Sequence, residues 1–259
     1  MSDIVVELKH FSFSMGCREV LRDISISINQ GAYLSIIGPN GAGKTTLLKC
    51  INRILKGGRG VLNVKGVPIN SYSQKELARL ISYVPQSDGS SLPFSVLDFV
   101  SMGRYPYMKR FFSLGKTDEE IVQESLELTG TKDFSRRILS TLSGGERQKV
   151  FIAAALAQRS TLLLLDEPMT FLDPKYQAGI YKILSDINRN LGVSIISVNH
   201  DINGAMLSSK EILALKDGSV AFFCRNKDEV NKDMLEGIYE HKFTCINQPD
   251  TGVSVFFPE

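Results

Sequence analysis

An octapeptide at residues 38–45, GPNGAGKT, combines the residue types that a phosphate group requires. It follows the apolar run Tyr33–Ile37 and precedes the helical pattern TLLKCINRIL. Glycines let backbone N–H groups converge on phosphate oxygens, and a helix N-terminus adds favourable partial charge. The Lys44 ammonium can reach the β- and γ-phosphates, and the Thr45 hydroxyl can reach Mg²⁺. The pattern therefore predicts ATP and Mg²⁺ binding by Gly38, Pro39, Asn40, Gly41, Ala42, Gly43, Lys44, Thr45 and Thr46.

Two adjacent carboxylates, Asp166 and Glu167, follow the apolar run Leu162–Leu165. In α/β sheets, ligands bind beyond the carboxyl ends of the strands. Neighbouring side chains on a strand point to opposite faces, so we expect the two acids to have different roles. We predict that Asp166 contributes to the outer shell of Mg²⁺ and that Glu167 deprotonates the attacking water. The alternative is a strand that simply ends in solvated acids.

The apolar patterns predict an α/β protein. Up to about residue 35, the runs IVVEL, FSFSM and DISISI alternate with period two, which is typical of half-buried antiparallel strands. Continuous apolar runs are typical of parallel strands covered on both faces, and they occur at Tyr33–Ile37, Leu80–Val84, Leu162–Leu165 and Ser194–Val198. Helical patterns lie between these runs, so we expect a parallel core with an antiparallel flank.

Short motifs predict where several elements begin and end. Asp173-Pro174 supplies a helix N-cap and a first-turn proline, and Gly192 ends that helix. Thr117-x-x-Glu120 predicts a capping box for a helix that ends near Gly130. The tetrapeptide Lys216–Ser219 predicts a hairpin turn. The segment Ser87–Ser140 lacks a core strand, so we interpret it as a helical subdomain that returns to the core through a helix at about residues 144–158.

Composition excludes several classes of protein. The net charge of +2 in 259 residues gives no reason to expect a nucleic-acid partner. The four cysteines are scattered, which favours a reducing compartment over a disulfide framework or a zinc site. The N-terminus does not resemble a signal peptide, and no apolar run is long enough to span a bilayer. We expect a soluble chain whose role at a membrane, if any, depends on a partner.

The pentapeptide LSGGE at residues 142–146, followed by RQKV, resembles the signature motif of ATP-binding cassette (ABC) ATPases. The resemblance covers nearly the whole chain. It implies an α/β fold: a P-loop NTPase core with a RecA-like parallel sheet, an N-terminal antiparallel β subdomain and an inserted helical subdomain. On this basis we predict a core at residues 1–86 and 159–225, a helical subdomain at 87–158 and a C-terminal extension at 226–259.

The resemblance also implies roles for residues that alone would have ordinary explanations. Gln86 matches the Q-loop glutamine, Asp173 the D-loop aspartate and His200 the switch histidine. Alone, these would be a loop amide, an N-cap and a strand-end histidine, and Ser143-x-x-Glu146 would be a plain capping box. In the family's mechanism, the signature residues Ser143, Gly144 and Gly145 bind the γ-phosphate held by a second copy of the chain. His200 then contacts the γ-phosphate, and Gln86 senses Mg²⁺ and the water.

One position departs from the family pattern. An aromatic ring usually stacks on adenine just before a glycine like Gly16, and here that residue is Met15. Phe13 on the same strand face could substitute, Met15 could make a sulfur–ring contact, or both could belong to the core. We predict weaker or less base-selective nucleotide binding.

The segment LPFSVLDFVSMGRYPY at residues 92–107 resembles the branch of importers for iron-siderophore, haem and cobalamin, in which V-x-x-x-V-x-x-G-R-x-P is typical. We expect an ATPase that is peripheral to the cytoplasmic face of the membrane. Its partners would be integral membrane permease subunits and, indirectly, an extracytoplasmic substrate-binding protein. We expect part of the stretch Phe94–Phe112 to form a groove for a short permease helix, and the alternative is that its aromatic side chains fill the core of the helical subdomain. The residues concerned are Phe94, Phe99, Tyr105, Tyr107, Phe111 and Phe112, beside Arg104, Lys109 and Arg110. The alternatives are a soluble assembly ATPase, as in iron–sulfur cluster scaffold systems, and a transporter of another substrate.

Overall fold

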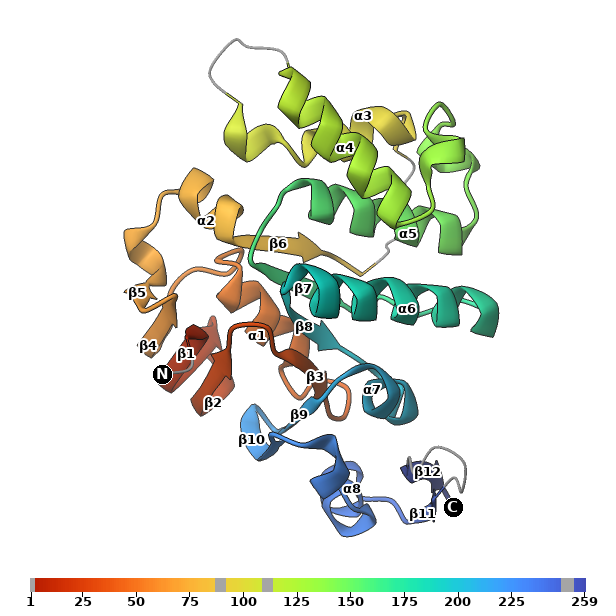
Figure 1. Cartoon of the computed structure of the whole chain (residues 1–259). Helices are drawn as coiled ribbons and strands as arrows, with labels where there is room; N and C mark the ends of the chain where they lie inside the picture. The colour runs from red at the N-terminus through yellow and green to blue at the C-terminus, as the bar shows by residue number, and fades with distance from the viewer. Residues whose placement is uncertain (1–2, 87–91, 109–113, 248–253) are drawn as a thin grey trace. The chain divides into compact units, whose positions relative to one another are not determined.

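The computed structural model describes residues 3–86, 92–108, 114–247 and 254–259 (Figure 1). The chain divides into two compact units. The first contains Met1–Ser71 and Ser194–Glu259, and the second contains Tyr72–Val193. The subdomain boundaries expected at residues 87 and 158 remain a prediction.

A four-stranded antiparallel sheet opens the first unit. β1 (Ile4–Met15) lies between β2 (Arg18–Asn29) and β4 (Arg59–Val64), and β4 also pairs with β5 (Val67–Pro68). Buried and exposed side chains alternate along β2, with Ile24, Ile26 and Ile28 facing the core. The antiparallel flank predicted from the period-two pattern is confirmed.

Parallel strands form the second sheet region of this unit. β3 (Tyr33–Ile37) is parallel to both of its neighbours, β8 (Ser194–Val198) and β9 (Glu211–Lys216). Every residue of β3 and β8 is buried, which explains their continuous apolar sequences. β10 (Ser219–Cys224) pairs antiparallel with β9. The turn residues Asp217 and Gly218 have φ angles of 50° and 82°, as a tight hairpin requires, so the hairpin prediction is confirmed.

The remaining elements of the first unit include a hydrophobic C-terminal region. The helices of the first unit are α1 (Lys44–Ile51), α7 (Ile202–Ser208) and α8 (Lys232–Tyr239). Short 3-10 turns lie at Ile69–Ser71 and Lys227–Glu229. A hairpin of β11 (Phe243–Asn247) and β12 (Ser254–Pro258) ends the chain. Phe243 and Phe256 belong to one buried cluster with Ile37, Ile212 and Leu235, so these late elements share a core with β3 and β9.

The second unit combines two parallel strands with most of the long helices. α2 (Gln74–Leu80) leads into β6 (Ile81–Val84), which pairs in parallel with β7 (Leu162–Asp166). The helices are α3 (Val96–Met102), α4 (Lys116–Leu128), α5 (Gly144–Ala157) and α6 (Pro174–Leu191), with 3-10 turns at Tyr105–Tyr107, Lys132–Phe134 and Leu139–Thr141. Figure 1 shows α3, α4 and α5 grouped together, and their buried residues form one cluster that includes Val100, Leu126 and Ala153.

Helix boundaries confirm one predicted cap and correct another. Asp173 caps α6 and Gly192 ends it, as expected. The capping box predicted at Thr117-x-x-Glu120 is wrong, because α4 begins earlier, at Lys116, with Gly115 as its N-cap. The Asp118 carboxylate, rather than that of Glu120, accepts the backbone N–H of the cap residue at 3.2 Å. The helix still ends where predicted, with Gly130 at φ 63° just beyond it.

Candidate functional site

The glycine-rich loop connects β3 to α1 in the first unit, and its glycines are required by backbone geometry. Gly38 and Gly43 have φ angles of 139° and 97°, in the region that favours glycine. A Cβ atom at Gly38 would lie 2.1 Å from the backbone oxygen of Leu215. The predicted order of strand, loop and helix is therefore present.

Lys44 is the first residue of α1, and its side chain folds back over the loop. The residue is only 5% exposed. Its ammonium donates to the carbonyl oxygens of Gly38 at 2.6 Å and Pro39 at 2.9 Å. A phosphate group offers a stronger, charged acceptor to the same ammonium. Lys44 is thus held beside the loop in a position to exchange backbone carbonyls for phosphate oxygens.

His200 lies two residues after the end of β8, and hydrogen bonds fix the residues on both sides of it. The buried Asn199 side chain donates to the Ser35 hydroxyl at 2.9 Å. The Asp201 carboxylate caps α7 by accepting the backbone N–H groups of Asn203 and Gly204, each at 3.0 Å. His200 itself is exposed, so its ring can reach a ligand.

In the second unit, Asp166 and Glu167 each receive a hydrogen bond from a side chain. Asp166 ends β7 and is 2% exposed, and the Tyr83 hydroxyl donates to its carboxylate at 3.0 Å. Burial and the charge of Asp166 raise the pKa of Tyr83, so the phenol stays protonated and remains a donor. Sequence reasoning missed Tyr83. Its place on β6, which pairs with β7, is the signal that could have found it.

Glu167 and Gln86 are brought together. The Gln86 amide donates to the Glu167 carboxylate at 2.6 Å, and the Thr170 hydroxyl donates to the same oxygen at 3.3 Å. Glu167 has a φ angle of 51°, a conformation that non-glycine residues adopt rarely and that is typical of functional sites. The two residues that the resemblance linked through water chemistry therefore contact each other directly.

The signature segment does form a capping box at the start of α5. The Ser143 hydroxyl accepts the Glu146 N–H at 3.3 Å, and the Glu146 carboxylate accepts the Ser143 N–H at 2.8 Å. The hydroxyl acts here as an acceptor, so its own proton remains available for donation to an anion. Gly145 is needed for packing, because a Cβ there would lie 2.3 Å from the Tyr176 ring. Ser143 and Gly144 are exposed and accessible to a ligand.

The other predicted contact residues divide between core and surface. Phe13 is 6% exposed and belongs to the core, so it offers no face for stacking on a base. Met15 is 54% exposed and stays a candidate for contact with adenine. Asp173 caps α6 by accepting the Tyr176 N–H at 3.1 Å, and it is exposed.

The donor set fits Mg²⁺ bound together with a nucleotide. The predicted metal residues, Thr45, Gln86 and Asp166, each offer a side-chain oxygen atom, which Mg²⁺ prefers. Within the described ranges, no group of three or more His, Cys, Asp or Glu side chains could hold a metal ion.

A groove of about 420 Å³ lies beside Gln86. Its walls include Tyr83, Phe99, Met102, Gly103 and Phe151. Among the described aromatic residues predicted to form the permease groove, Phe99 lines this pocket. Phe94 and Tyr105 are exposed and do not line it. Lys109, Arg110, Phe111 and Phe112, which belonged to the same prediction, lie outside the described residues.

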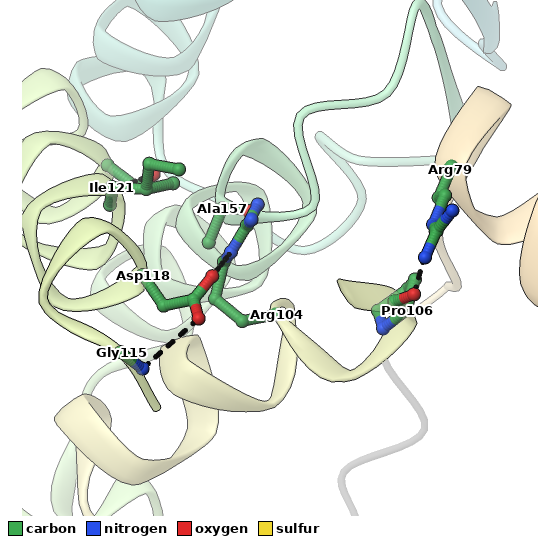
Figure 2. Close-up of polar contacts among 8 residues, drawn as sticks. Arg79, Arg104, Pro106, Gly115, Asp118, Ile121 and Ala157 are labelled. Atoms are coloured by element: carbon green, nitrogen blue, oxygen red, sulfur yellow. Dashed lines mark hydrogen bonds and ion pairs between the residues drawn. The ribbon is translucent and has the colours of Figure 1, made fainter. Parts of the chain in front are cut away.

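A buried arginine, Arg104, follows directly after the groove residues Met102 and Gly103. Figure 2 shows Arg104 between Asp118 of α4 and Ala157 of α5. Arg104 is 4% exposed, and its guanidinium donates to the Asp118 carboxylate at 2.8 Å and to the Ala157 carbonyl at 2.7 Å. It also lies 4.0 Å from the centroid of the Tyr107 ring. The Gly-Arg-x-Pro motif therefore fixes α3, α4 and α5 to one another.

Comparison with known proteins identifies the family. A family model described as ABC transporter matches residues 21–170. The chain belongs to the ABC transporter family. Among curated ABC proteins, it is 36% identical to the iron(3+)-hydroxamate import ATP-binding protein FhuC of Bacillus subtilis, over 93% of this chain and 89% of that one. It is 33% identical to the ferric enterobactin transport ATP-binding protein FepC of Escherichia coli, over 100% and 96% of the two chains.

Solved ABC structures confirm the fold class. CbiO1 from Clostridium perfringens, part of the transporter complex cbiONQ, has a TM-score of 0.78 at 30% identity, covering 88% of this chain and 90% of that one. The dimeric ATP-binding cassette MJ0796, bound to ADP and Pi, has a TM-score of 0.72 at 29% identity, covering 85% and 97%. In the described part of this chain, no helix is long and apolar enough to cross a membrane.

Proposed function

We propose that this chain hydrolyses ATP with Glu167 as the general base. The phosphates bind to Gly38–Thr46, and Thr45 and Asp166 hold Mg²⁺. The observation that carries the proposal is the Gln86–Glu167 hydrogen bond beside the buried Asp166, because it fixes a carboxylate directly after the metal-binding carboxylate. This arrangement suits alignment and deprotonation of a water.

Each residue contributes a separate part of phosphoryl transfer. Lys44 neutralises charge on the β- and γ-phosphates, and His200 contacts the γ-phosphate. Mg²⁺, when bound, offsets the charge that develops on the phosphate oxygens. Gln86, which donates to Glu167 in this structure, links the water-activating carboxylate to the groove that Gln86 lines.

Replacing Glu167 with Gln tests the assigned base. Loss of the carboxylate should reduce hydrolysis by about 100-fold or more, the usual contribution of a general base. Binding of Mg·ATP should survive, because phosphate contacts come from the glycine-rich loop. Phosphate release and ATP affinity are measured on both proteins, with Glu119→Gln, an exposed residue of α4, as the matched control. Unchanged turnover in Glu167→Gln would refute the assignment.

Two copies of the chain share each ATP in this proposal. Ser143 at the start of α5 is exposed and retains a hydroxyl proton to donate, and helix N-termini attract anions. One chain already has its own phosphate loop, so a second anion site is best explained as serving a partner copy. The dimeric relative MJ0796 supports this arrangement.

The ATPase powers import of a metal chelate of the iron-siderophore class through separate membrane permease subunits, at the cytoplasmic face of the membrane. Support comes from the named activities of the FhuC and FepC relatives and from the groove beside Gln86, whose apolar walls suit a short permease helix. A substrate-binding protein outside the membrane would deliver the chelate.

Co-purification of the tagged chain separates import from the alternative role in cluster assembly. An importer subunit should retain a polytopic membrane protein in detergent. Replacing Phe99 with Arg in the groove should release that protein, whereas Tyr105→Arg on the exposed 3-10 turn should not. Recovery of soluble scaffold proteins in place of a membrane protein would overturn the import role.

A further inference from the structure

The C-terminal extension contacts the glycine-rich loop through a residue that no motif predicts. Tyr239 is the last residue of α8, and its hydroxyl accepts the backbone N–H of Gly38 at 3.1 Å. Gly38 is the first residue of the loop, 201 positions earlier in the chain. Both residues belong to the first unit.

The Gly38 N–H needs such a partner. Gly38 is buried, and its φ angle of 139° turns the chain away from β3, which ends at Ile37. A buried N–H group without a hydrogen bond is costly, because it has lost its contact with water. The loop cannot move toward Leu215 to find another partner, since the two backbones are already in close contact.

Gly38 is held on both sides, by two contacts of different kinds. Its carbonyl accepts from the Lys44 ammonium at 2.6 Å, and its N–H donates to Tyr239. Lys44 must turn toward the phosphates when ATP binds. The Tyr239 contact does not involve the Lys44 ammonium, so it can hold the start of the loop before and after Lys44 turns.

Tyr239 is itself fixed by the C-terminal elements. Its ring packs at 5.9 Å from that of Phe243 and against the buried cluster that contains Phe256. Asn203 of α7 binds the backbone of Phe256 twice, donating to its carbonyl and accepting its N–H, each at 2.9 Å. Burial raises the pKa of Tyr239, so its hydroxyl stays neutral at physiological pH.

We propose that Tyr239 is a positioning residue for the phosphate loop, through which the C-terminal extension sets the affinity for ATP. The hydroxyl keeps Gly38 in the conformation that directs the rest of the loop toward phosphate. Without it, the loop samples conformations that do not bind, and the apparent affinity falls in proportion to the competent fraction. This inference rests on the proposed function only in naming ATP as the ligand.

Replacing Tyr239 with Phe removes the hydroxyl and keeps the ring in its cluster. The Kd for Mg·ATP should rise by about threefold to tenfold, while kcat at saturating ATP stays within about twofold of the wild type. Tyr105→Phe makes the same chemical change at a residue that is 74% exposed, and its Kd should not change. The far-UV spectrum and melting temperature of each variant are measured alongside.

The outcomes separate the two proposals. If the wild type does not bind ATP, the proposed function fails. If the wild type binds ATP and Tyr239→Phe binds it equally well, the positioning role is overturned, even if the melting temperature falls. Should the variant not fold, hydrogen exchange of the Gly38 amide in the wild type decides: protection with and without ATP supports the anchor, and rapid exchange contradicts it.

Discussion

The position of the Glu167 carboxylate is set by its backbone conformation. In the structure, β7 ends at Asp166, and Glu167 leaves the strand with a φ angle of 51°. The contacts of Glu167 with Gln86 and Thr170 depend on that backbone conformation, which residue types alone do not specify.

The residue that contacts adenine is a second question at this scale. Phe13 is buried, which leaves the exposed Met15 as the candidate on this strand. Stacking of a base on an aromatic ring is worth about 1–3 kcal/mol, and a methionine provides less. Replacing Met15 with Tyr should therefore raise the affinity for ATP by about fivefold. Titration with ATP and with GTP measures the effect.

Ser14→Tyr is the matched control for this change, because Ser14 is the exposed neighbour on the opposite face of β1. Its nucleotide affinities should equal those of the wild type. The prediction would be contradicted if the wild type strongly preferred ATP to GTP and Met15→Tyr bound ATP no more tightly. Adenine would then be recognised by other residues.

The start of a helix was predictable where one residue was a clear N-cap candidate. The prediction failed at α4, where two residues could serve as the N-cap. Asp173 and Ser143 cap α6 and α5 as the sequence patterns indicated. At α4, Thr117 resembles a cap, but Gly115 takes that role because the Asp118 carboxylate can reach its N–H. The same carboxylate binds Arg104, a long-range contact that local patterns do not contain.

The Arg104–Asp118 pair yields a prediction about stability and pH. The hydrogen bond from Arg104 lowers the pKa of Asp118 in the folded state. Because the pKa of Asp118 is lower in the folded state, its contact with Arg104 stabilises the fold at pH values above the ordinary aspartate pKa of about 3.9. This stabilisation is lost as the pH falls through the pKa of Asp118 in the folded protein. Asp118→Asn should cost about 1.5–3 kcal/mol at neutral pH, because a charged hydrogen bond is lost.

Urea unfolding of the wild type and Asp118→Asn, at about pH 7 and at about pH 3, measures this difference. The difference between the free energies of unfolding of the two proteins should be smaller at the lower pH. Asp133→Asn at an exposed position serves as the control and should change stability by less than about 0.5 kcal/mol. A difference that is the same at both pH values would show that the charge of Asp118 does not contribute.

At the scale of the whole molecule, the fold class and the family were predictable, whereas long-range contacts were not. The strands at Tyr33–Ile37 and Ser194–Val198 are confirmed, because their buried positions require continuous apolar sequence. The resemblance to iron-siderophore importers is confirmed by the FhuC and FepC relatives. The contact of Tyr239 with Gly38 could not be predicted, since it joins residues 201 positions apart that share no motif.

The proposed mechanism requires that two copies of the chain share each ATP. The structure of the Glu167→Gln variant loaded with Mg·ATP tests this claim most directly, because the variant should retain the nucleotide. We predict a two-fold dimer in which the Ser143 hydroxyl of one copy lies within hydrogen-bonding distance of the γ-phosphate held by Gly38–Thr46 of the other. Ser143 of both copies lying remote from either γ-phosphate would contradict the account.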